Sequence, residues 1–584
     1  SSLRSHSSSS GPVAGSSVCR DCHADAWQSW HASFHRTMTQ RPSPGAELPL
    51  ALATSPEPAI VLAPFAGETL DYAGFRATMD RRAGVPRVRV ARLGESGELG
   101  EVVLDVEVAL TVGSHRYQQY VGAIEGELFR LPLAWHRGEA RWIHMNGAFV
   151  EPEGEPGSLD DYQRHLSRWN DNCIFCHNTE PVPGLLPTQE FESAVGELGI
   201  ACEACHGPAQ AHVDRQRNPL RRMLAGRDLG DGSITQPARL DAGRESAICG
   251  RCHGQRIARD IASVMAHGDG FVPGDSLAAV SRPIFADSTI GTEALPFAMR
   301  FWPDGTPRLS AYEYQALLLS PCYAEGAGLG CNHCHDMHGD DPAGQLRAGR
   351  AGEGACVGCH ELAPAHGGHR DVASVDCLDC HMPPITYGLL EGMVSHRITS
   401  PDPGLLVGRQ DQPDACTQCH VDRSRRWAAE SMASLGLRGS PPGDEDPLER
   451  EASRVLLDLH GGDPIQRNLA AHALAQADAS GSIAQRMIWI AAALEDEYPS
   501  VRWFAWRGLR SLAEAEQADE LVAALASFDY LGPIEARVAA LDRIHASLDA
   551  ALSEGQHADA QAEAEALFDE LSEARARTAI WIGE

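Results

Sequence analysis

The feature that most constrains this chain is a five-residue motif, Cys-x-x-Cys-His, which occurs eight times among its 584 residues. Each copy places two thiols three positions apart and a histidine directly after the second one. Two thiols at this spacing can add to the two vinyl groups of one haem, and the adjacent histidine then reaches the iron as an axial ligand. The motif cysteines are Cys19, Cys22, Cys173, Cys176, Cys202, Cys205, Cys249, Cys252, Cys331, Cys334, Cys356, Cys359, Cys377, Cys380, Cys416 and Cys419, and the motif histidines are His23, His177, His206, His253, His335, His360, His381 and His420.

Two other uses of paired cysteines explain these motifs less well. A structural zinc site needs two such pairs to share one ion, and it leaves the histidine after every pair without a role. Disulfide bonds likewise give no role to the histidine that follows each pair. We therefore predict that the chain binds eight covalent haem c groups, each with one iron.

The motifs lie close together, between residues 19 and 420, and three of them fall within fifty-one residues. Only 43% of the chain is hydrophobic, so we expect the haem macrocycles to supply much of the core. The predicted fold class is α+β, with a loop-rich multihaem cytochrome c domain wrapped around a chain of haems over residues 18–430. The serine-rich residues 1–17 are expected to form a flexible N-terminal linker.

One long stretch of this domain, residues 40–165, contains no motif. Apolar and polar residues alternate at 87–92, 101–108 and 127–131, which predicts strands, and turns rich in Gly and Pro separate them. We expect a small antiparallel β-subdomain here.

The last part of the chain, residues 445–584, repeats at a period of 35 residues. The period relates Arg467, Arg502 and Arg537, and it also relates Pro464 and Pro499, which stand where proline is tolerated at a helix start. A period of this length predicts an α-helical solenoid of stacked pairs, of the HEAT or tetratricopeptide kind. Such repeats contact mainly their neighbours and offer a surface for docking a partner; the alternative is a cap that only covers haem edges.

Each motif supplies one axial ligand, so a six-coordinate iron needs a second one from elsewhere. His338 lies three residues beyond His335, too near to fold back onto the same iron, so we expect it to serve a neighbouring haem. Helical spacing places His31 and His35 on one face, where either can be a ligand; surface histidines are the alternative. The candidate second ligands are His31 or His35, His115, His165, His212, His267, His338, His366 or His369, and His396.

Charge and hydropathy restrict the partners. The formal net charge is −31 and the chain has no lysine. Nucleic acid and anionic membrane surfaces bind preferentially to basic patches, so we do not expect either of them as a partner. No apolar run reaches the roughly eighteen residues of a membrane span. Because haem is normally attached to this motif outside the cytoplasm, we expect an exported protein, periplasmic or extracellular, whose leader has been removed. The expected partners are redox proteins or further copies of the cytochrome.

Several short stretches, in order along the chain, resemble a bacterial family of multihaem c-type cytochromes fused to tetratricopeptide or HEAT repeats. The resemblance implies an electron carrier and constrains the fold better than the substrate. Relatives tend to carry Met-Tyr where this chain has Cys322-Tyr323. The matching stretches are residues 27–38, 118–120, 202–208, 271–275, 304–305, 334–339, 381–387 and 413–416.

Cys322 is the one cysteine outside the motifs, nine residues before Cys331. Three fates are open to it: a buried free thiol, a ligand to a haem iron, or a covalent link to another chain.

Two functions from different classes fit these observations. The first is an electron conduit of mostly bis-histidine, low-spin haems, for which the candidate list supplies enough second ligands. The alternative is a reductase or oxidase of a small nitrogen or sulfur compound at one open-coordinate haem, near Cys322, His333 and Arg300. The absence of lysine excludes a lysine-ligated catalytic haem. An electron-transfer protein is the preferred interpretation over an enzyme.

Overall fold

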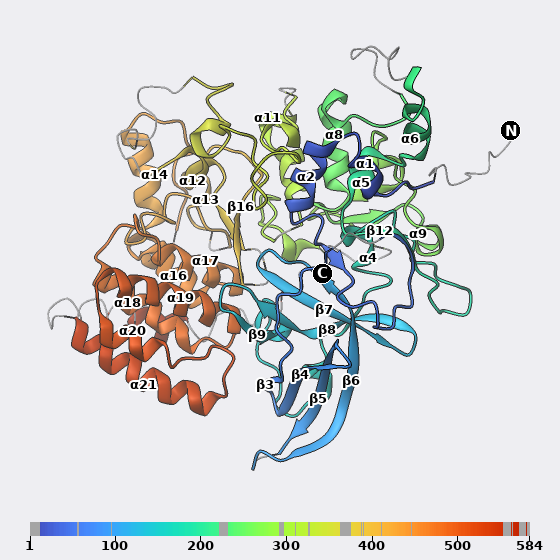
Figure 1. The fold of residues 1–584 in the computed structure, drawn as a ribbon. Helices are drawn as coiled ribbons and strands as arrows, with labels where there is room; N and C mark the ends of the chain where they lie inside the picture. The colour runs from blue at the N-terminus through green and yellow to red at the C-terminus, as the bar shows by residue number, and fades with distance from the viewer. Residues whose placement is uncertain are drawn as a thin grey trace.

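The computed structural model describes residues 12–580 except 55–57, 95, 221–231, 291–296, 310, 325–327, 362–368, 370–374, 387, 389, 410, 446, 553–561, 563–564 and 572–579. Most of the expected linker at residues 1–17 therefore lies outside the described residues. Figure 1 shows three regions: a twisted sheet, a region of short helices and loops that carries the motifs, and a group of C-terminal helices beside the sheet. No helix among the described residues is long and apolar enough to cross a membrane.

A nine-stranded sheet confirms the predicted antiparallel β-structure, and its main path runs in the order β10-β8-β7-β6-β5-β4-β3. The expected strands at 87–92, 101–108 and 127–131 lie within β5, β6 and β8 respectively. Two further strands join the sheet, β1 on β6 and β9 on β8. The strands are β1 (Thr39–Gln40), β3 (Glu68–Tyr72), β4 (Phe75–Arg82), β5 (Val85–Leu93), β6 (Leu99–Val112), β7 (Tyr117–Ile124), β8 (Glu127–His136), β9 (Arg141–His144) and β10 (Ser167–Arg168).

Residue alternation explains why these segments form strands with one buried face. In β4, Phe75, Ala77 and Met79 are fully buried, while the residues between them are partly exposed. This period of two matches the alternation of side chains across a pleated strand. The turn before β4 contains Gly74, whose φ of 81° lies in the left-handed region that glycine adopts without strain.

The motif region consists of short helices joined by loops. Motif cysteines or histidines lie in or beside α1 (Ser16–Cys19), α4 (Ile174–His177), α5 (Cys202–His206), α8 (Ala242–Gly250), η5 (Cys331–His333), η6 (Gly352–Ala355) and α12 (Cys377–His381). The other helices of this region are α2 (Ala24–Ala32), α3 (Leu159–Tyr162), α6 (Gln210–Gln216), α9 (Ile261–His267), α10 (Glu313–Leu319), α11 (Pro321–Ala324), α13 (Pro403–Leu406) and α14 (Arg425–Ser434).

The C-terminal helices begin where the repeat period places proline. Pro464 is the first residue of α17 (Pro464–Leu474), and Pro499 is the first residue of α19 (Pro499–Ala515). Neighbouring helices pack together in the pairs α16 with α17, α17 with α19, α18 with α19 and α20 with α21. The remaining members are α15 (Pro447–Glu451), α16 (Arg454–Gly461), α18 (Ile483–Ala492), α20 (Asp519–Leu525) and α21 (Ile534–Ala551).

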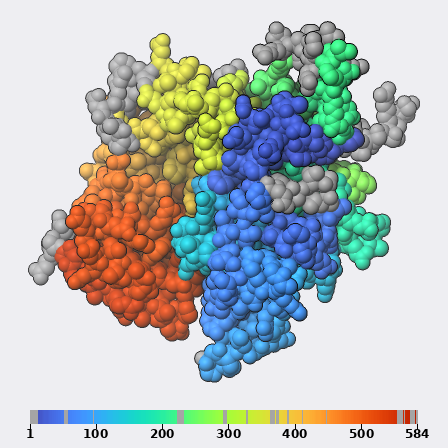
Figure 2. Space-filling view, in the orientation of Figure 1, coloured from blue at the N-terminus to red at the C-terminus, as the bar shows by residue number. Residues whose placement is uncertain are grey.

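These helices also pack against the β-sheet. One hydrophobic cluster contains Phe75 and Trp142 of the sheet together with Val501 and Ile544 of the helices. Two of the three periodic arginines, Arg502 and Arg537, form ion pairs with Glu153, which lies outside the C-terminal helices. In Figure 2 the C-terminal helices and the sheet adjoin along one side of the molecule. The face that carries these arginines is therefore used inside the chain.

Candidate haem-binding sites

Most of the motifs fold as a single turn that brings their chemistry together. In the first motif the backbone N–H of His23 donates to the carbonyl of Cys19 at 2.9 Å, and in the fifth the N–H of His335 donates to the carbonyl of Cys331 at 2.9 Å. Because these bonds span four residues, as in an α-helix, the first cysteine and the histidine lie on the same side of the turn. The motif cysteines are only partly buried or exposed.

Five motif histidines each face a second histidine ring, and the distance between the two ring centroids is similar in all five pairs. The ring centroids of four of the pairs are 6.2 or 6.3 Å apart, and those of the fifth are 5.8 Å apart. The pairs are His23 with His212, His253 with His35, His206 with His338, His335 with His396, and His420 with His369.

This spacing is too wide for direct ring stacking and suits a metal ion between the rings. Imidazole nitrogens bind metals at about 2 Å, and adding the distance from nitrogen to ring centre on both sides gives about 6 Å. The second histidine always follows a motif different from the one it faces. His338, for example, follows the fifth motif in the chain and faces His206 of the third. These residues fit a haem iron ligated by two histidines.

Backbone carbonyls orient three of the motif histidines. Nδ1 of His206 lies 2.9 Å from the carbonyl of Thr235, Nδ1 of His335 lies 2.9 Å from that of Gly344, and Nδ1 of His381 lies 2.8 Å from that of Thr399. When Nδ1–H donates to a carbonyl, Nε2 is left free for a metal. The sequence carries no signal for these partners, because any residue supplies a carbonyl.

Burial favours the neutral form of these rings, the form that binds metal. Burial lowers the pKa of His206, against the opposing effect of the Thr235 carbonyl. For His35, burial and the neighbouring ring of His253 lower the pKa to about 4. Burial likewise lowers the pKa of His177 to about 4.

Thiols of different motifs meet in pairs. Here these thiols stand for the sulfurs that would be joined to haem. The pairs link the first motif to the third, the second to the fourth, the fourth to the fifth, and the sixth to the seventh. They are Cys19 with Cys202, Cys176 with Cys252, Cys249 with Cys331, and Cys356 with Cys377.

Buried carboxylates fasten the motifs to one another. Glu203, inside the third motif, accepts backbone N–H bonds at 3.0 and 2.9 Å from Ala14 and Gly15, just before the first motif. Glu245 on α8 accepts the backbone N–H of Asn332 in the fifth motif at 2.8 Å. Charge-assisted bonds of this kind are about twice as strong as neutral ones.

An ion pair also anchors the fourth motif. Arg251 lies between Cys249 and Cys252 and is 6% exposed. Its guanidinium donates to both carboxylate oxygens of Asp269, at 3.1 and 3.0 Å. Sequence reasoning missed Arg251, Asp269, Glu203 and Glu245, because their partners are distant in sequence.

The other candidate ligands have different surroundings. His31 stacks on Trp27 and His115 stacks on Phe34, with ring centroids 4.4 and 4.2 Å apart. His165 is buried against Phe149, and its Nε2 lies 3.4 Å from a carboxylate oxygen of Glu151. His267 is exposed at the end of α9, and His366 lies outside the described residues.

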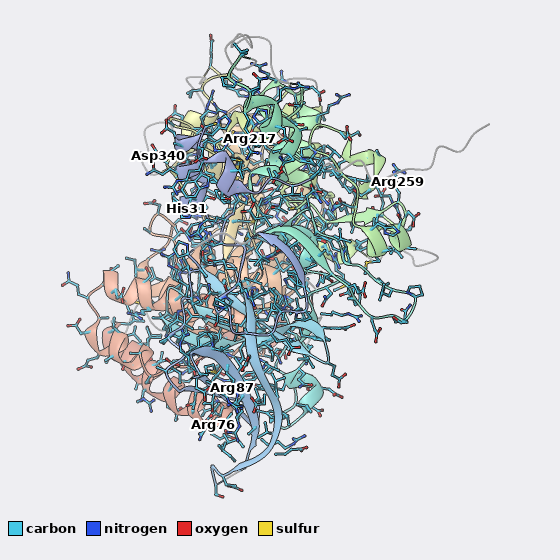
Figure 3. All side chains as sticks on the ribbon, turned by 45° about the vertical axis from the view of Figure 1, so that its right-hand side comes forward. His31, Arg76, Arg87, Arg217, Arg259 and Asp340 are labelled. Carbon is cyan, nitrogen blue, oxygen red and sulfur yellow. The ribbon has the colours of Figure 1, made fainter. Side chains whose placement is uncertain are left out.

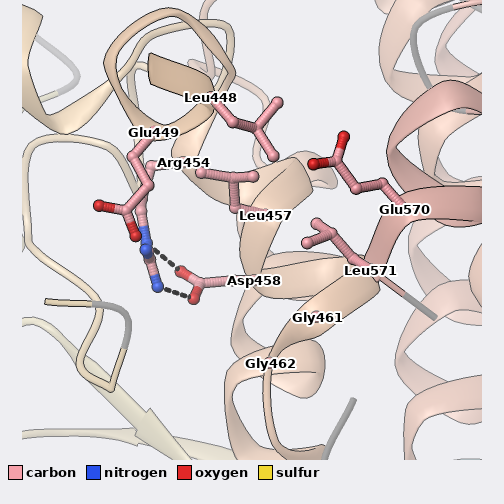
Figure 4. Close-up of a pocket in the computed structure, with 9 residues that line it drawn as sticks. All are labelled: Leu448, Glu449, Arg454, Leu457, Asp458, Gly461, Gly462, Glu570 and Leu571. Atoms are coloured by element: carbon pink, nitrogen blue, oxygen red, sulfur yellow. Dashed lines mark hydrogen bonds and ion pairs between the residues drawn. The ribbon is translucent and has the colours of Figure 1, made fainter. Parts of the chain in front are cut away.

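Two surface features lie apart from the paired histidines. Figure 3 labels Arg76 and Arg87 low on the sheet, far from His31 in the motif region; these arginines pair with Asp71 and Asp105. Figure 4 shows a pocket between α16 and Glu570, where Arg454 pairs with Asp458. Neither feature contains a motif residue.

Cys322 lies on α11 of the motif region and is half-buried. Cys322, His333 and Arg300 are the residues near which the alternative function places an open haem. His333 caps its own turn, where its Nδ1 accepts the backbone N–H of Gly330 at 3.0 Å. Arg300 donates to the hydroxyl of Tyr312 at 2.9 Å.

A family model matches the part of the chain that contains the last four motifs. Residues 323–364 and 369–425 match a family model described as a doubled CXXCH motif. The doubled motif indicates a multihaem c-type cytochrome with covalently bound haem iron. No curated protein sequence matches the chain. A solved structure described as the crystal structure of outer cell wall cytochrome OcwA is similar with a TM-score of 0.43 and 15% identity, covering 92% of this chain and 99% of that chain.

Proposed function

We propose that this multihaem cytochrome is an exported protein that conducts electrons through eight covalently bound haems, most of them ligated by two histidines. The observation that carries the proposal is the set of five facing histidine pairs. A bound haem supplies a one-electron couple at its iron. The paired histidines would fill both axial positions and so keep substrate away from that iron.

The chain's own residues would hold the haems in a continuous path. Thiol pairs join four sets of motifs, and three further pairs of cysteines are near enough for the charge of one to raise the pKa of the other. With these neighbouring pairs added to the four thiol pairs, every motif lies near another one, and all eight form one connected set. Continuity matters because electron tunnelling weakens steeply with distance. The further three pairs are Cys205 with Cys252, Cys334 with Cys359, and Cys380 with Cys419.

Crossed ligation would fix the order of the haems. His212 follows the third motif and faces His23 of the first, while His35 follows the first motif and faces His253 of the fourth. A shift of any motif would therefore pull a ligand from a neighbour. In all five pairs both axial ligands would be histidines. The reduction potential of each haem would then depend on burial and on hydrogen bonds to its ligands.

The proposed partners are redox proteins or further copies of this chain. The chain is acidic, with a formal charge of −31, so a partner with a basic docking surface would associate faster and in a salt-dependent way. Docking through the C-terminal repeats would use the surface of those helices that faces away from the sheet.

Intact mass measurement of the purified protein tests the proposal. We expect the mass of the chain plus eight covalent haems, retained after denaturation, and a redox titration spread over a wide range of potential. Zinc in the cysteine pairs, or fewer haems, would contradict it.

A further inference from the structure

His177 differs from the five paired motif histidines. Three motif histidines lie outside those five pairs: His177, His360 and His381. His381 of the seventh motif has contacts of its own, whereas within the part of the chain that the structure describes no histidine ring faces His177 or His360 of the sixth motif. Residues 362–368, close to His360, lie outside the described residues. The strands beneath the second motif, by contrast, are described, so the surroundings of His177 are defined. His177 therefore stands out as a ligand on one side of its haem.

Arg130 on β8 is a buried cation for which the described part of the chain supplies no counter-ion. Its residue exposure is 2%, and among the described residues it forms no ion pair. Its one hydrogen bond runs from Nη2 to the hydroxyl of Ser167 at 3.2 Å, and its Nε has no partner. Burying an unpaired charge is expensive, so such a group marks a place where an anion binds.

Arg130 lies on the face of the sheet that the second motif covers. Leu128, two residues earlier on the same strand, packs in one cluster with Ile174 and Cys173 of the motif. Residues two apart on a strand point to the same face. Arg130 accordingly points toward the side of the sheet on which the second motif, and with it His177, packs.

Phe149, His165 and Glu151 form the rest of the cluster around Arg130. Its guanidinium lies 5.5 Å from the ring centre of Phe149, and the ring of His165 stacks on Phe149 at 4.0 Å. Glu151 is already occupied, because it pairs with Arg164 at 2.9 Å and with His165 at 3.4 Å. Arg130 is thus the one cation of this cluster left for a ligand among the residues described.

We propose that Arg130 binds a small anion, of the size of azide or nitrite, at the haem that His177 ligates. The proposal rests on the proposed function, since it needs a haem on the second motif, and it assigns to that haem a ligand site that the histidine-paired haems lack. It places the open position beside Arg130 and not beside Cys322.

Ligand titration of the ferric holoprotein, followed by electron paramagnetic resonance and optical spectra, tests this site. We expect one high-spin haem that azide and the neutral ligand imidazole each convert to low spin. Loss of a charge-assisted hydrogen bond should make Arg130→Gln bind azide about ten- to a hundredfold more weakly, with imidazole unchanged. Arg130→Lys should keep part of the azide affinity.

Arg168→Gln is the matched control, because Arg168 is a more exposed neighbour that already pairs with Glu127 and Asp171; its azide affinity should equal that of the wild type. The inference is overturned if the ferric protein has no high-spin haem, or if Arg130→Gln weakens azide and imidazole equally. It is also overturned if that variant changes only a reduction potential, as expected when Arg130 pairs with a haem propionate. If one of these results is obtained and the mass still shows eight haems, only the anion site is rejected and the proposed electron transfer is unaffected. If the mass shows that a haem is missing, both proposals are rejected.

Discussion

The rings of His35 and His253 face each other edge to face, with centroids 6.2 Å apart and planes at 87°. Three other facing pairs are closer to parallel, at 16°, 21° and 28°. Perpendicular axial imidazoles leave two iron d orbitals nearly degenerate, while parallel ones split them. The haem between His35 and His253 should therefore differ magnetically from the others.

We predict that the ferric protein shows a strongly anisotropic low-spin signal from this haem beside rhombic signals from the near-parallel pairs. His35→Ala should abolish the anisotropic signal by removing one axial ligand, and a high-spin signal should replace it. Low-temperature electron paramagnetic resonance measures both changes.

His338→Ala is the matched control, because its ring faces His206 at 16°. This variant should remove one rhombic signal and keep the anisotropic one. If both variants lose the same signal, the assignment of partners is wrong.

The buried ion pair of the fourth motif predicts a pH-dependent stability. Burial raises the pKa of Asp269, but Arg251 and Arg256 outweigh burial and hold that pKa below its usual value. A carboxylate with a depressed pKa in the folded state stabilises the fold above the pKa it has when unfolded, about 4, and the stabilisation is lost as pH falls through the folded value. Asp269→Asn should cost about 3–5 kcal/mol at neutral pH, since it leaves a buried arginine uncompensated.

Thermal unfolding as a function of pH checks this prediction. The difference between the wild type and Asp269→Asn should shrink below about pH 4. Asp71→Asn, which breaks an exposed pair with Arg76, should leave the unfolding midpoint nearly unchanged. Equal effects of the two substitutions would show that the buried pair does not stabilise the fourth motif.

Removal of the residues after Glu445 should destabilise the sheet. Repeat periodicity alone predicts only a local loss, because repeats contact mainly their neighbours. In the structure, however, the C-terminal helices share a hydrophobic cluster with the sheet, and Glu153 pairs with Arg502 and Arg537. We expect the truncated chain to unfold at lower temperature and to aggregate. A soluble truncated chain with the wild-type unfolding midpoint would contradict this prediction and show that the C-terminal helices do not stabilise the sheet.

The sequence predicts local features of this protein well. Strands at residues 87–92, 101–108 and 127–131 follow from alternation, which depends only on neighbours along the chain, and the structure contains them within β5, β6 and β8. The single turns of the motifs and the helix starts at Pro464 and Pro499 are equally local.

The pairing of histidines lies beyond what sequence alone can predict. The position of His338 predicts that it serves a haem other than that of its neighbour His335, but nothing in the sequence selects His206 as the ring that it faces. The carbonyl of Thr235 and the carboxylate of Asp269 were missed for the same reason, because their partners meet only after the loops fold. Conversely, His165 is one of the candidate ligands named from the sequence, and in the structure it packs against Phe149 and Glu151.

Near-infrared magnetic circular dichroism of the fully ferric protein tests the central claim most directly, because the energy of the charge-transfer band identifies the axial ligands and its intensity counts the haems. With haem content fixed by mass on the same sample, we predict bis-histidine ligation for at least the five haems of the facing pairs. Bis-histidine intensity for fewer than five haems, or a dominant histidine–methionine band, would contradict the account.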